Sequence, residues 1–281
     1  MASQRILITG ISGLLAPWLV AAAEHRGIVI TTGRSAGDIP CDLSDPAAVG
    51  RLISQAKPDV VIHAAAMTDV DSCEREPEQA DIANRKVTEH LCAALKQDAT
   101  FLYLSTDQVY ADVAGPHREE DVGPVNSYGA SKLAGERAAL EHRDGIVART
   151  SFFGPSRTPG RASLSDFVVD SLSSRREITL FSDVLFTPLH AITLADLLFE
   201  MVQSELRGSY NVATREGLSK ADFALEIARR ADLQTGSATL GVSSAVEGRA
   251  KRTIDLRMAP EKLEIALART MPTLREEIAK L

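Results

Sequence analysis

Apolar positions in the first half of the chain follow two alternating patterns. Short runs rich in β-branched residues predict five strands, at residues 5–9, 28–32, 60–63, 101–105 and 145–149. Between them the apolar residues recur with the period of an α-helix, which predicts helices at residues 14–22, 46–55, 77–97 and 128–142. Such alternation, with nearly continuous apolar strands, is typical of a parallel sheet covered by helices on both faces. The pattern therefore predicts a doubly wound α/β domain of the Rossmann type.

The alternation stops after residue 154. Residues 152–160 are rich in Gly, Pro, Ser and Arg and predict a loop. Helical spacing then returns at residues 164–174, 194–203, 220–231 and 260–269, with only brief strand candidates between them. We predict a first domain over residues 1–153, to which segments near 181–213 return, and a smaller, mostly helical lobe over residues 154–281.

The turn between the first strand and the first helix has the sequence GISGLLA at residues 10–16, a G-x-x-G-x-x-G/A pattern ending in Ala16. Glycines there let a pyrophosphate approach the backbone, and the unpaired amides of the helix N-terminus attract its charge. A plain structural turn is the alternative, but the position after a strand and before an amphipathic helix favours dinucleotide binding. The residues expected to contact the cofactor are Gly10, Ser12, Gly13, Leu14 and Leu15.

The end of the second strand indicates which dinucleotide binds. Acidic residues at this place accept a hydrogen bond from the ribose 2′-OH of NAD, whereas arginine accommodates the 2′-phosphate of NADP. Here Arg34 and Ser35 occur, and no acid precedes Asp38. Arg34 can pair with a phosphate and Ser35 can donate to it, which favours NADPH and leaves NADH as the alternative. Asp42, followed by Leu43, stands where a carboxylate could accept from the adenine amino group.

A tyrosine and a lysine four residues apart, Tyr128 and Lys132, lie on one face of the fourth predicted helix. A phenol with a pKa near 10 is a weak acid at neutral pH, and a nearby cation lowers that pKa. This spacing is common on surface helices, but the fourth strand ends in Ser-Thr-Asp with Thr106 at its centre. Ligands of doubly wound sheets bind at the carboxyl ends of the strands. We therefore expect all three side chains beside a nicotinamide.

With these motifs in this order, the chain resembles the extended short-chain dehydrogenase/reductases, and among them the dTDP-4-dehydrorhamnose reductase family. The stretches that carry the resemblance are ILITGISGLLA (6–16), PDVVIHAAAMTDVDSCE (58–74), LYLSTDQVY (102–110), PVNSYGASKLAGE (124–136) and ARTSFFG (148–154). The resemblance spans nearly the whole chain and is densest up to residue 154. It implies NADPH-dependent reduction of the 4-keto group of a nucleotide-activated 6-deoxy sugar, with the cofactor on the first domain and the substrate on the second lobe.

The resemblance also implies residue roles. Tyr128 protonates the ketone oxygen as hydride arrives from NADPH, Lys132 lowers the pKa of Tyr128 and holds the nicotinamide ribose, and Thr106 hydrogen-bonds the same oxygen. The residues implied to lie along the ribose and pyrophosphate are Ala64, Ala65 and Ala66. Those implied to face the substrate are Thr106, Asp107, Gln108 and Phe152.

Two of these residues depart from the family pattern. Gln108 stands where the family commonly has Tyr, and Phe152 stands where it has Trp. The sugar-nucleotide 4,6-dehydratases resemble the same stretch but carry Asp-Glu for acid–base work, and Gln108 cannot abstract a proton. Reduction is therefore favoured over dehydration. Another extended-type activity, such as epimerisation or reduction of a non-sugar ketone, stays open. So does a non-catalytic, NADP-binding regulatory role, because the regulatory subunit of methionine adenosyltransferase keeps the same motifs.

The composition of the chain limits the kinds of partner that it is expected to bind. The 281 residues include 31 Lys and Arg against 38 Asp and Glu, a formal charge of −7, which offers no positive face for nucleic acid. A basic group at residues 249–257 could hold a diphosphate or be a solvated face. Three separate cysteines indicate no disulfide framework or metal site. Residues 1–23 are a passable signal peptide, but the glycine turn favours a cytoplasmic protein without a membrane span. A homodimer is left open.

Overall fold

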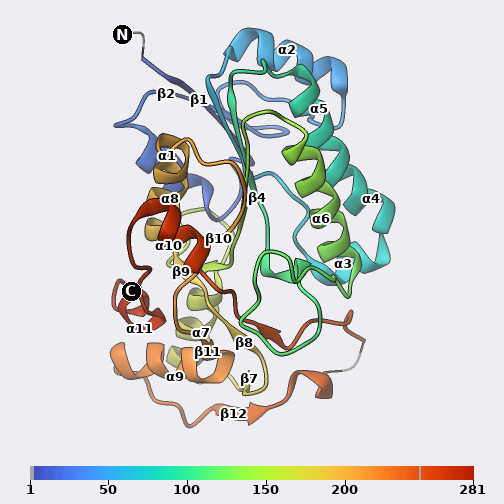
Figure 1. Ribbon diagram of the computed structural model, residues 1–281. Coiled ribbons are helices and arrows are strands. Elements are labelled where there is room, and N and C mark those ends of the chain that lie inside the picture. The colour runs from blue at the N-terminus through green and yellow to red at the C-terminus, as the bar shows by residue number, and fades with distance from the viewer. Residues whose placement is uncertain (1–2, 247) are drawn as a thin grey trace.

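The computed structural model describes residues 3–246 and 248–281, which are built around one central sheet (Figure 1). Six parallel strands stand in the order β10-β5-β4-β3-β1-β2. Their bounds are β1 Arg5–Thr9, β2 Ile28–Thr32, β3 Val60–His63, β4 Thr100–Leu104, β5 Gly145–Arg149 and β10 Gly208–Asn211. The five strands expected in the first half are present, and the prediction of a doubly wound parallel sheet is confirmed.

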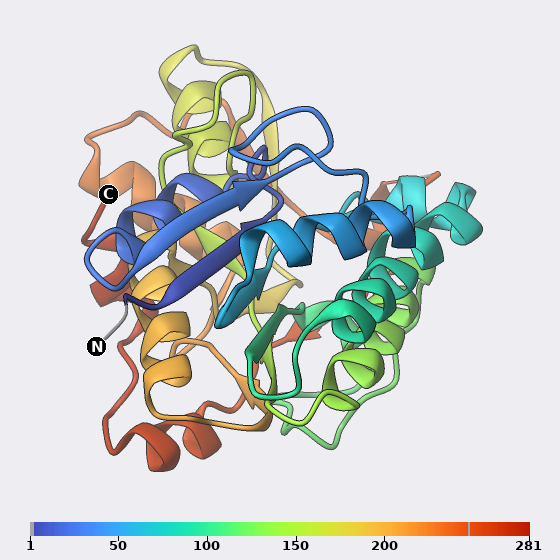
Figure 2. The same ribbon diagram turned by 90° about the horizontal axis from the view of Figure 1, so that it is seen from above.

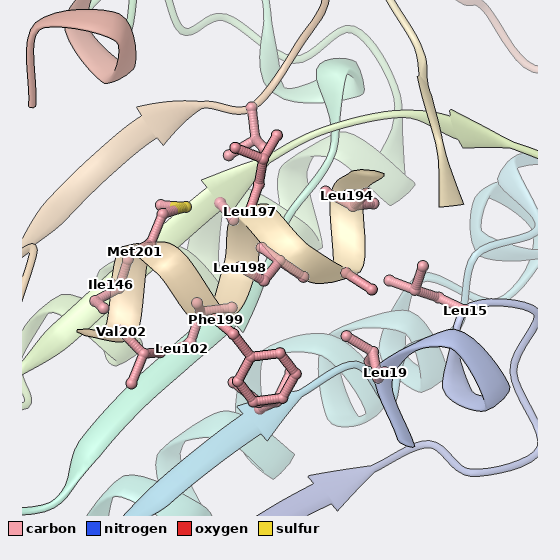
Figure 3. Packing of buried hydrophobic residues seen from close by; sticks show 14 of the residues in the cluster. Leu15, Leu19, Leu102, Ile146, Leu194, Leu197, Leu198, Phe199, Met201 and Val202 are labelled. Carbon is pink, nitrogen blue, oxygen red and sulfur yellow. The ribbon is translucent and has the colours of Figure 1, made fainter. Parts of the chain in front are cut away.

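Helices cover both faces of this sheet (Figures 1 and 2). One layer consists of α1 (Ala16–Ala23) and α8 (Ala191–Gln203), and the other of α2 (Pro46–Ala56), α5 (Val87–Ala94) and α6 (Ser127–Leu140). Because side chains alternate along a strand, each strand supplies both cores. Ile6 and Ile8 of β1 face the α1–α8 layer, whereas Leu7 faces the α2–α5–α6 layer. Leu198 and Phe199 of α8 lie over the sheet opposite Leu102 (Figure 3).

The helix expected over residues 77–97 is the main difference from the sequence pattern. It consists of α4 (Pro77–Asp81), a π-helical turn η1 (Ile82–Lys86) and α5, which ends at Ala94. Asn84 within η1 is fully buried, and its side-chain amide bonds both backbone groups of Met67. The wider π-turn is associated with this inward polar side chain, which apolar periodicity does not reveal. A short helix before it, α3 (Val70–Arg75), was not expected.

The second half contributes its own core around Phe153, Phe186 and Phe223. Its helices are α7 (Leu164–Ser173), α9 (Lys220–Arg230), α10 (Glu261–Leu267) and α11 (Leu274–Ile278). Its short strands are β6 (Phe152–Phe153), β7 (Ile178–Phe181), β8 (Leu185–Phe186), β9 (Leu189–His190), β11 (Leu218–Ser219), β12 (Ala238–Gly241) and β13 (Asp255–Leu256). The chain also forms two 3₁₀ turns, η2 (Asp107–Val109) in the first half and η3 (Ser243–Ala245) in the second.

Two local predictions in this half need correction. The stretch expected to be loop begins with β6, which pairs with β9. Helix α8 starts three residues earlier than its apolar spacing indicates, because the His190 ring nitrogen Nδ1 accepts from the Ile192 amide and caps the helix.

Strand β10 pairs with β5, so the chain returns to the central sheet after α7. No helix in the described ranges is long and apolar enough to cross a lipid bilayer.

Candidate active site

A cleft of about 820 Å³ runs along the carboxyl ends of the central strands. Strand order reverses around β1, since β2 lies on one side of it and β3 on the other, and ligands of doubly wound sheets bind at such a point. The expected site residues that line the cleft are Gly10, Ser12, Gly13, Leu14, Leu15, Arg34, Asp42, Leu43, Ala64, Ala65, Ala66, Thr106, Tyr128, Lys132 and Phe152. Ser35, Asp107 and Gln108 are not among the lining residues.

The turn after β1 requires glycine at its first position. Gly10 has a φ of +76°, and a Cβ there would lie 2.7 Å from the backbone nitrogen of Ala65. The Gly10 amide donates to the carbonyl of Thr32 and the Gly13 amide to that of Gly10, which closes the turn. The amides of Ser12, Leu14 and Leu15, in contrast, have no hydrogen-bond partner among the described residues. Free amides at the start of α1 fit an anionic group such as the pyrophosphate of a dinucleotide.

A buried polar contact holds the wall opposite this turn. The Thr9 hydroxyl oxygen accepts from the Ala65 amide at 3.1 Å and lies 2.7 Å from Nδ1 of His63. Burial lowers the pKa of His63 to about 3, and the charge of Lys132 acts in the same direction, so the imidazole is neutral at pH 7. The carboxyl ends of β1 and β3 and the segment after β3 are thereby fixed against each other.

The far end of the cleft carries the residues expected to distinguish NADPH from NADH. The Arg34 side chain is exposed there, beside Asp42. Asp42 accepts from both the hydroxyl and the amide of Ser44, at 2.7 and 3.0 Å, and these bonds lower the pKa of its carboxyl. Ser35 is exposed outside the cleft wall. Arg34 is therefore placed to meet a phosphate, whereas one oxygen of Asp42 already has two donors.

At the other end, Tyr128 stands in the first turn of α6. The side chain of Asn126 caps this helix by accepting from the Gly129 amide at 2.8 Å. Only 8% of Tyr128 is exposed, and burial raises its pKa, while the neighbouring Thr106 hydroxyl acts in the opposite direction. The charges of Asp107 and Cys73 act in the same direction as burial, so the pKa of Tyr128 lies above that of a free phenol, and the lowering of this pKa by Lys132 stays a prediction. The phenol is protonated at neutral pH.

Lys132 follows one helical turn later and is almost fully buried. Its ammonium donates to the backbone oxygen of Leu104 at 2.7 Å and lies 4.0 Å from the centre of the Tyr103 ring. Burial lowers the pKa of Lys132 to about 7, and the negative charge of Glu136 opposes this shift. The lysine thus reaches the end of β4, two residues before Thr106.

Asp107 and Gln108 lie behind the cleft wall. The Asp107 carboxylate accepts from the Thr106 hydroxyl at 3.2 Å, and burial raises its pKa. The Gln108 side chain lies between Asp107 and Asn126, at 3.4 Å from each. Their position explains why neither lines the cleft: both support residues that do, namely Thr106 and the first turn of α6.

Sequence reasoning missed several residues of the cleft. Ser151 lines it with a buried hydroxyl oxygen, and this hydroxyl acts on the neighbouring Asp107, whose pKa it lowers against the effect of burial. Arg161 reaches it from the loop after β6, and the Thr158 hydroxyl of the same loop donates to the Gly13 backbone at 3.0 Å. Ser151 stands next to the expected Phe152 in a stretch that carries the family resemblance, whereas nothing local marks Arg161, because its loop approaches the glycine turn only in the folded chain.

The four residues of the basic group expected to hold a diphosphate pair with three carboxylates of the chain. Arg252 forms a two-pronged pair with Asp71, at 2.9 and 3.1 Å. The remaining pairs are Arg249 with Asp71, Lys251 with Asp112 and Arg257 with Asp255. A diphosphate would have to compete with these carboxylates, so the group is not a free cationic surface.

A dinucleotide cradle that leads to a tyrosine, a lysine and a threonine at the carboxyl edge of a parallel sheet defines an extended short-chain dehydrogenase/reductase. The chain belongs to the family described as the RmlD substrate binding domain, whose model matches residues 4–281. The resemblance inferred from the sequence is thereby confirmed.

Relatives of known name agree with this assignment. A dTDP-4-dehydrorhamnose reductase of Burkholderia thailandensis is 31% identical over 86% of this chain and 84% of that protein. Methionine adenosyltransferase 2 subunit beta of Xenopus laevis is 30% identical over 80% of this chain and 72% of that protein. The solved structure of a dTDP-4-dehydrorhamnose reductase from Yersinia enterocolitica is 28% identical, with a TM-score of 0.85 over 99% of this chain and 98% of that one.

Proposed function

We propose that this protein reduces the 4-keto group of a nucleotide-activated 6-deoxy sugar with NADPH. The observation that carries the proposal is the meeting of Tyr128, Lys132 and Thr106 in one cleft with the glycine turn at residues 10–16. Two of the relatives described above are dTDP-4-dehydrorhamnose reductases, which supports a sugar nucleotide as substrate. In this proposal the domain up to residue 153 binds the cofactor and supplies the groups that contact the ketone, and the lobe from residue 154 onward binds the remainder of the substrate.

The bound nicotinamide would supply a hydride to the carbonyl carbon of the substrate. Tyr128 gives its proton to the carbonyl oxygen as negative charge develops there, and its protonated state at neutral pH suits this role. In this proposal the Thr106 hydroxyl, which donates to Asp107 in the structure, turns to donate to the same oxygen and orients the ketone toward the phenol. Lys132, in its charged form, stabilises the tyrosinate that remains and holds the ribose. The buried Ser151 hydroxyl can bond a sugar hydroxyl or the ketone oxygen.

The proposal is tested by following the loss of reduced-nicotinamide absorbance with dTDP-4-keto-6-deoxyhexoses. We expect turnover with NADPH in preference to NADH. The Tyr128→Phe variant should be about 10²- to 10⁴-fold slower, since it lacks the general acid, yet bind NADPH within a few-fold of the unmodified protein. Turnover that survives Tyr128→Phe would contradict the proposed chemistry.

A regulatory role is the second candidate, because one relative is a subunit of methionine adenosyltransferase. Such a protein would bind NADPH without oxidising it in the presence of any of these ketones. An epimerase would be distinguished by nicotinamide that copurifies and is regenerated in each cycle. Binding without oxidation would therefore reject the proposed reduction of these sugars.

A further inference from the structure

Glu136 is a buried carboxylate on α6 that does not line the cleft. Only 1% of the residue is exposed, and it stands one helical turn beyond Lys132, on the same face. Arg149 of β5 approaches it with two nitrogens, Nε at 3.0 Å and NH2 at 2.7 Å. The Ser105 hydroxyl also donates to it. Glu136 therefore joins α6 to the ends of two neighbouring strands.

These contacts meet at the end of β4 on which the active site is built. The Leu104 backbone oxygen receives the Lys132 ammonium, and the next residue, Ser105, donates to Glu136. Thr106 follows directly and lines the cleft. Three consecutive residues thus hold the lysine, the buried carboxylate and the hydroxyl that faces the substrate, so a shift of Glu136 would move all three.

Of the titratable groups around Lys132, Glu136 is the one whose negative charge acts on its amine. His63 of β3 is neutral, and burial raises the pKa of Tyr103 on β4 and of Tyr128 on α6, so both phenols are uncharged. The charges of Asp107 on η2 and of Cys73 on α3 raise the pKa of Tyr128. On η1, Arg85 and Lys86 pair with acids on their own helical run. Arg149 of β5 faces Glu136 itself.

We infer that Glu136 is a positioning residue for Lys132: it fixes the strand end on which the ammonium rests and places a buried carboxylate one helical turn from the lysine, on the same face of α6. The consequence for catalysis rests on the proposed function, but the charge state of Lys132 does not. Breaking the Glu136–Arg149 pair also leaves the buried guanidinium without a carboxylate, with only the Tyr110 hydroxyl and the Glu119 backbone oxygen as acceptors, which adds a second unfavourable charge near the lysine.

The test measures the protonation of Lys132 directly. Acetic anhydride acylates only unprotonated amines, so its reaction with Lys132, followed by peptide mass spectrometry across a pH series, gives the midpoint for this amine without cofactor. We expect the midpoint to fall by about one unit or more in Glu136→Gln. Glu141→Gln, an exposed carboxylate near the end of the same helix, should leave it unchanged. An unchanged midpoint in Glu136→Gln would overturn the inference.

Because Glu136→Gln could fold poorly, the double variant Glu136→Gln/Arg149→Met provides a second test. It removes both buried charges, so we expect a midpoint below that of the unmodified protein but above that of the single variant. A double-variant midpoint equal to that of the unmodified protein would contradict the role of Glu136. In the NADPH oxidation assay, the high-pH limit of activity should move down with the amine midpoint. Absence of oxidation by the unmodified protein would instead refute the proposed function and leave the amine result intact.

Discussion

Arg34 presents an exposed guanidinium at the mouth of the cleft, close to the carboxylate of Asp42. Charge-assisted hydrogen bonds contribute about 1.5–3 kcal/mol each. We therefore expect Arg34→Ala to weaken NADPH binding about 10- to 100-fold while NADH binding changes little. Titration of both nucleotides by calorimetry gives the two dissociation constants.

The matched control for this prediction is Arg51→Ala. Arg51 is also exposed, but it belongs to α2, and its guanidinium lies 3.8 Å from Asp45. Its removal should leave both affinities unchanged. Equal losses of NADPH and NADH affinity in Arg34→Ala would mean that Arg34 contributes to folding or to the shared part of the cofactor rather than to the 2′-phosphate.

For single residues, the sequence predicted which side chains gather at the cleft but not the charge states of these side chains. The four-residue spacing of Tyr128 and Lys132 correctly placed both on the cleft face of α6. Their pKa values could not be predicted, because each depends on how completely other elements exclude water. Burial raises the pKa of Tyr128 and lowers that of Lys132, and no property of the helix alone indicates either shift.

Among the elements, the π-helical turn η1 makes a prediction of its own. Asn84 in this turn accepts from the Met67 amide at 2.8 Å and donates to the Ser131 hydroxyl at 2.9 Å. Asn84→Ala would leave these buried groups without their partner, at a cost of about 1–3 kcal/mol of unfolding free energy. Urea unfolding measures the loss. Glu78→Ala, at an exposed site in α4, should change it by less than about 0.5 kcal/mol.

A loss in Asn84→Ala no larger than that of Glu78→Ala would mean that the turn, not the asparagine, holds the Met67 segment. The positions of the elements could be predicted from the sequence only where local residues determine them. Strand positions followed from local apolar runs, and four of the five strands of the first half have the predicted bounds. The π-helical turn at residues 82–86 did not, since it accompanies a side chain that finds its partners outside its own helix.

At the scale of the whole molecule, α8 ties the second half of the chain to the central sheet. Leu198 is fully buried in the core that β1, β4 and β5 share with α1. We expect Leu198→Ala to lower the unfolding free energy by about 2–5 kcal/mol. Fluorescence of the single tryptophan, Trp18 in α1, and far-UV circular dichroism should report one coincident transition.

The control is Ile192→Ala in the same helix, because Ile192 is 45% exposed and should tolerate truncation. Two separated transitions in Leu198→Ala would show instead that the two halves unfold independently. This prediction follows from the strand order, in which β10 pairs with β5 although about sixty residues separate them along the chain.

The sequence by itself determined the alternation of strands and helices, the glycine turn after β1 and the spacing of Tyr128 and Lys132, because each is a local pattern of a few residues. Only the tertiary structure decided that β10 pairs with β5, that Asn84 lies in a π-helical turn and that Glu136 and Arg149 pair one helical turn from Lys132. These features join residues distant in the chain, and their energies come from excluding water around polar groups. That exclusion exists only once the layers have packed together.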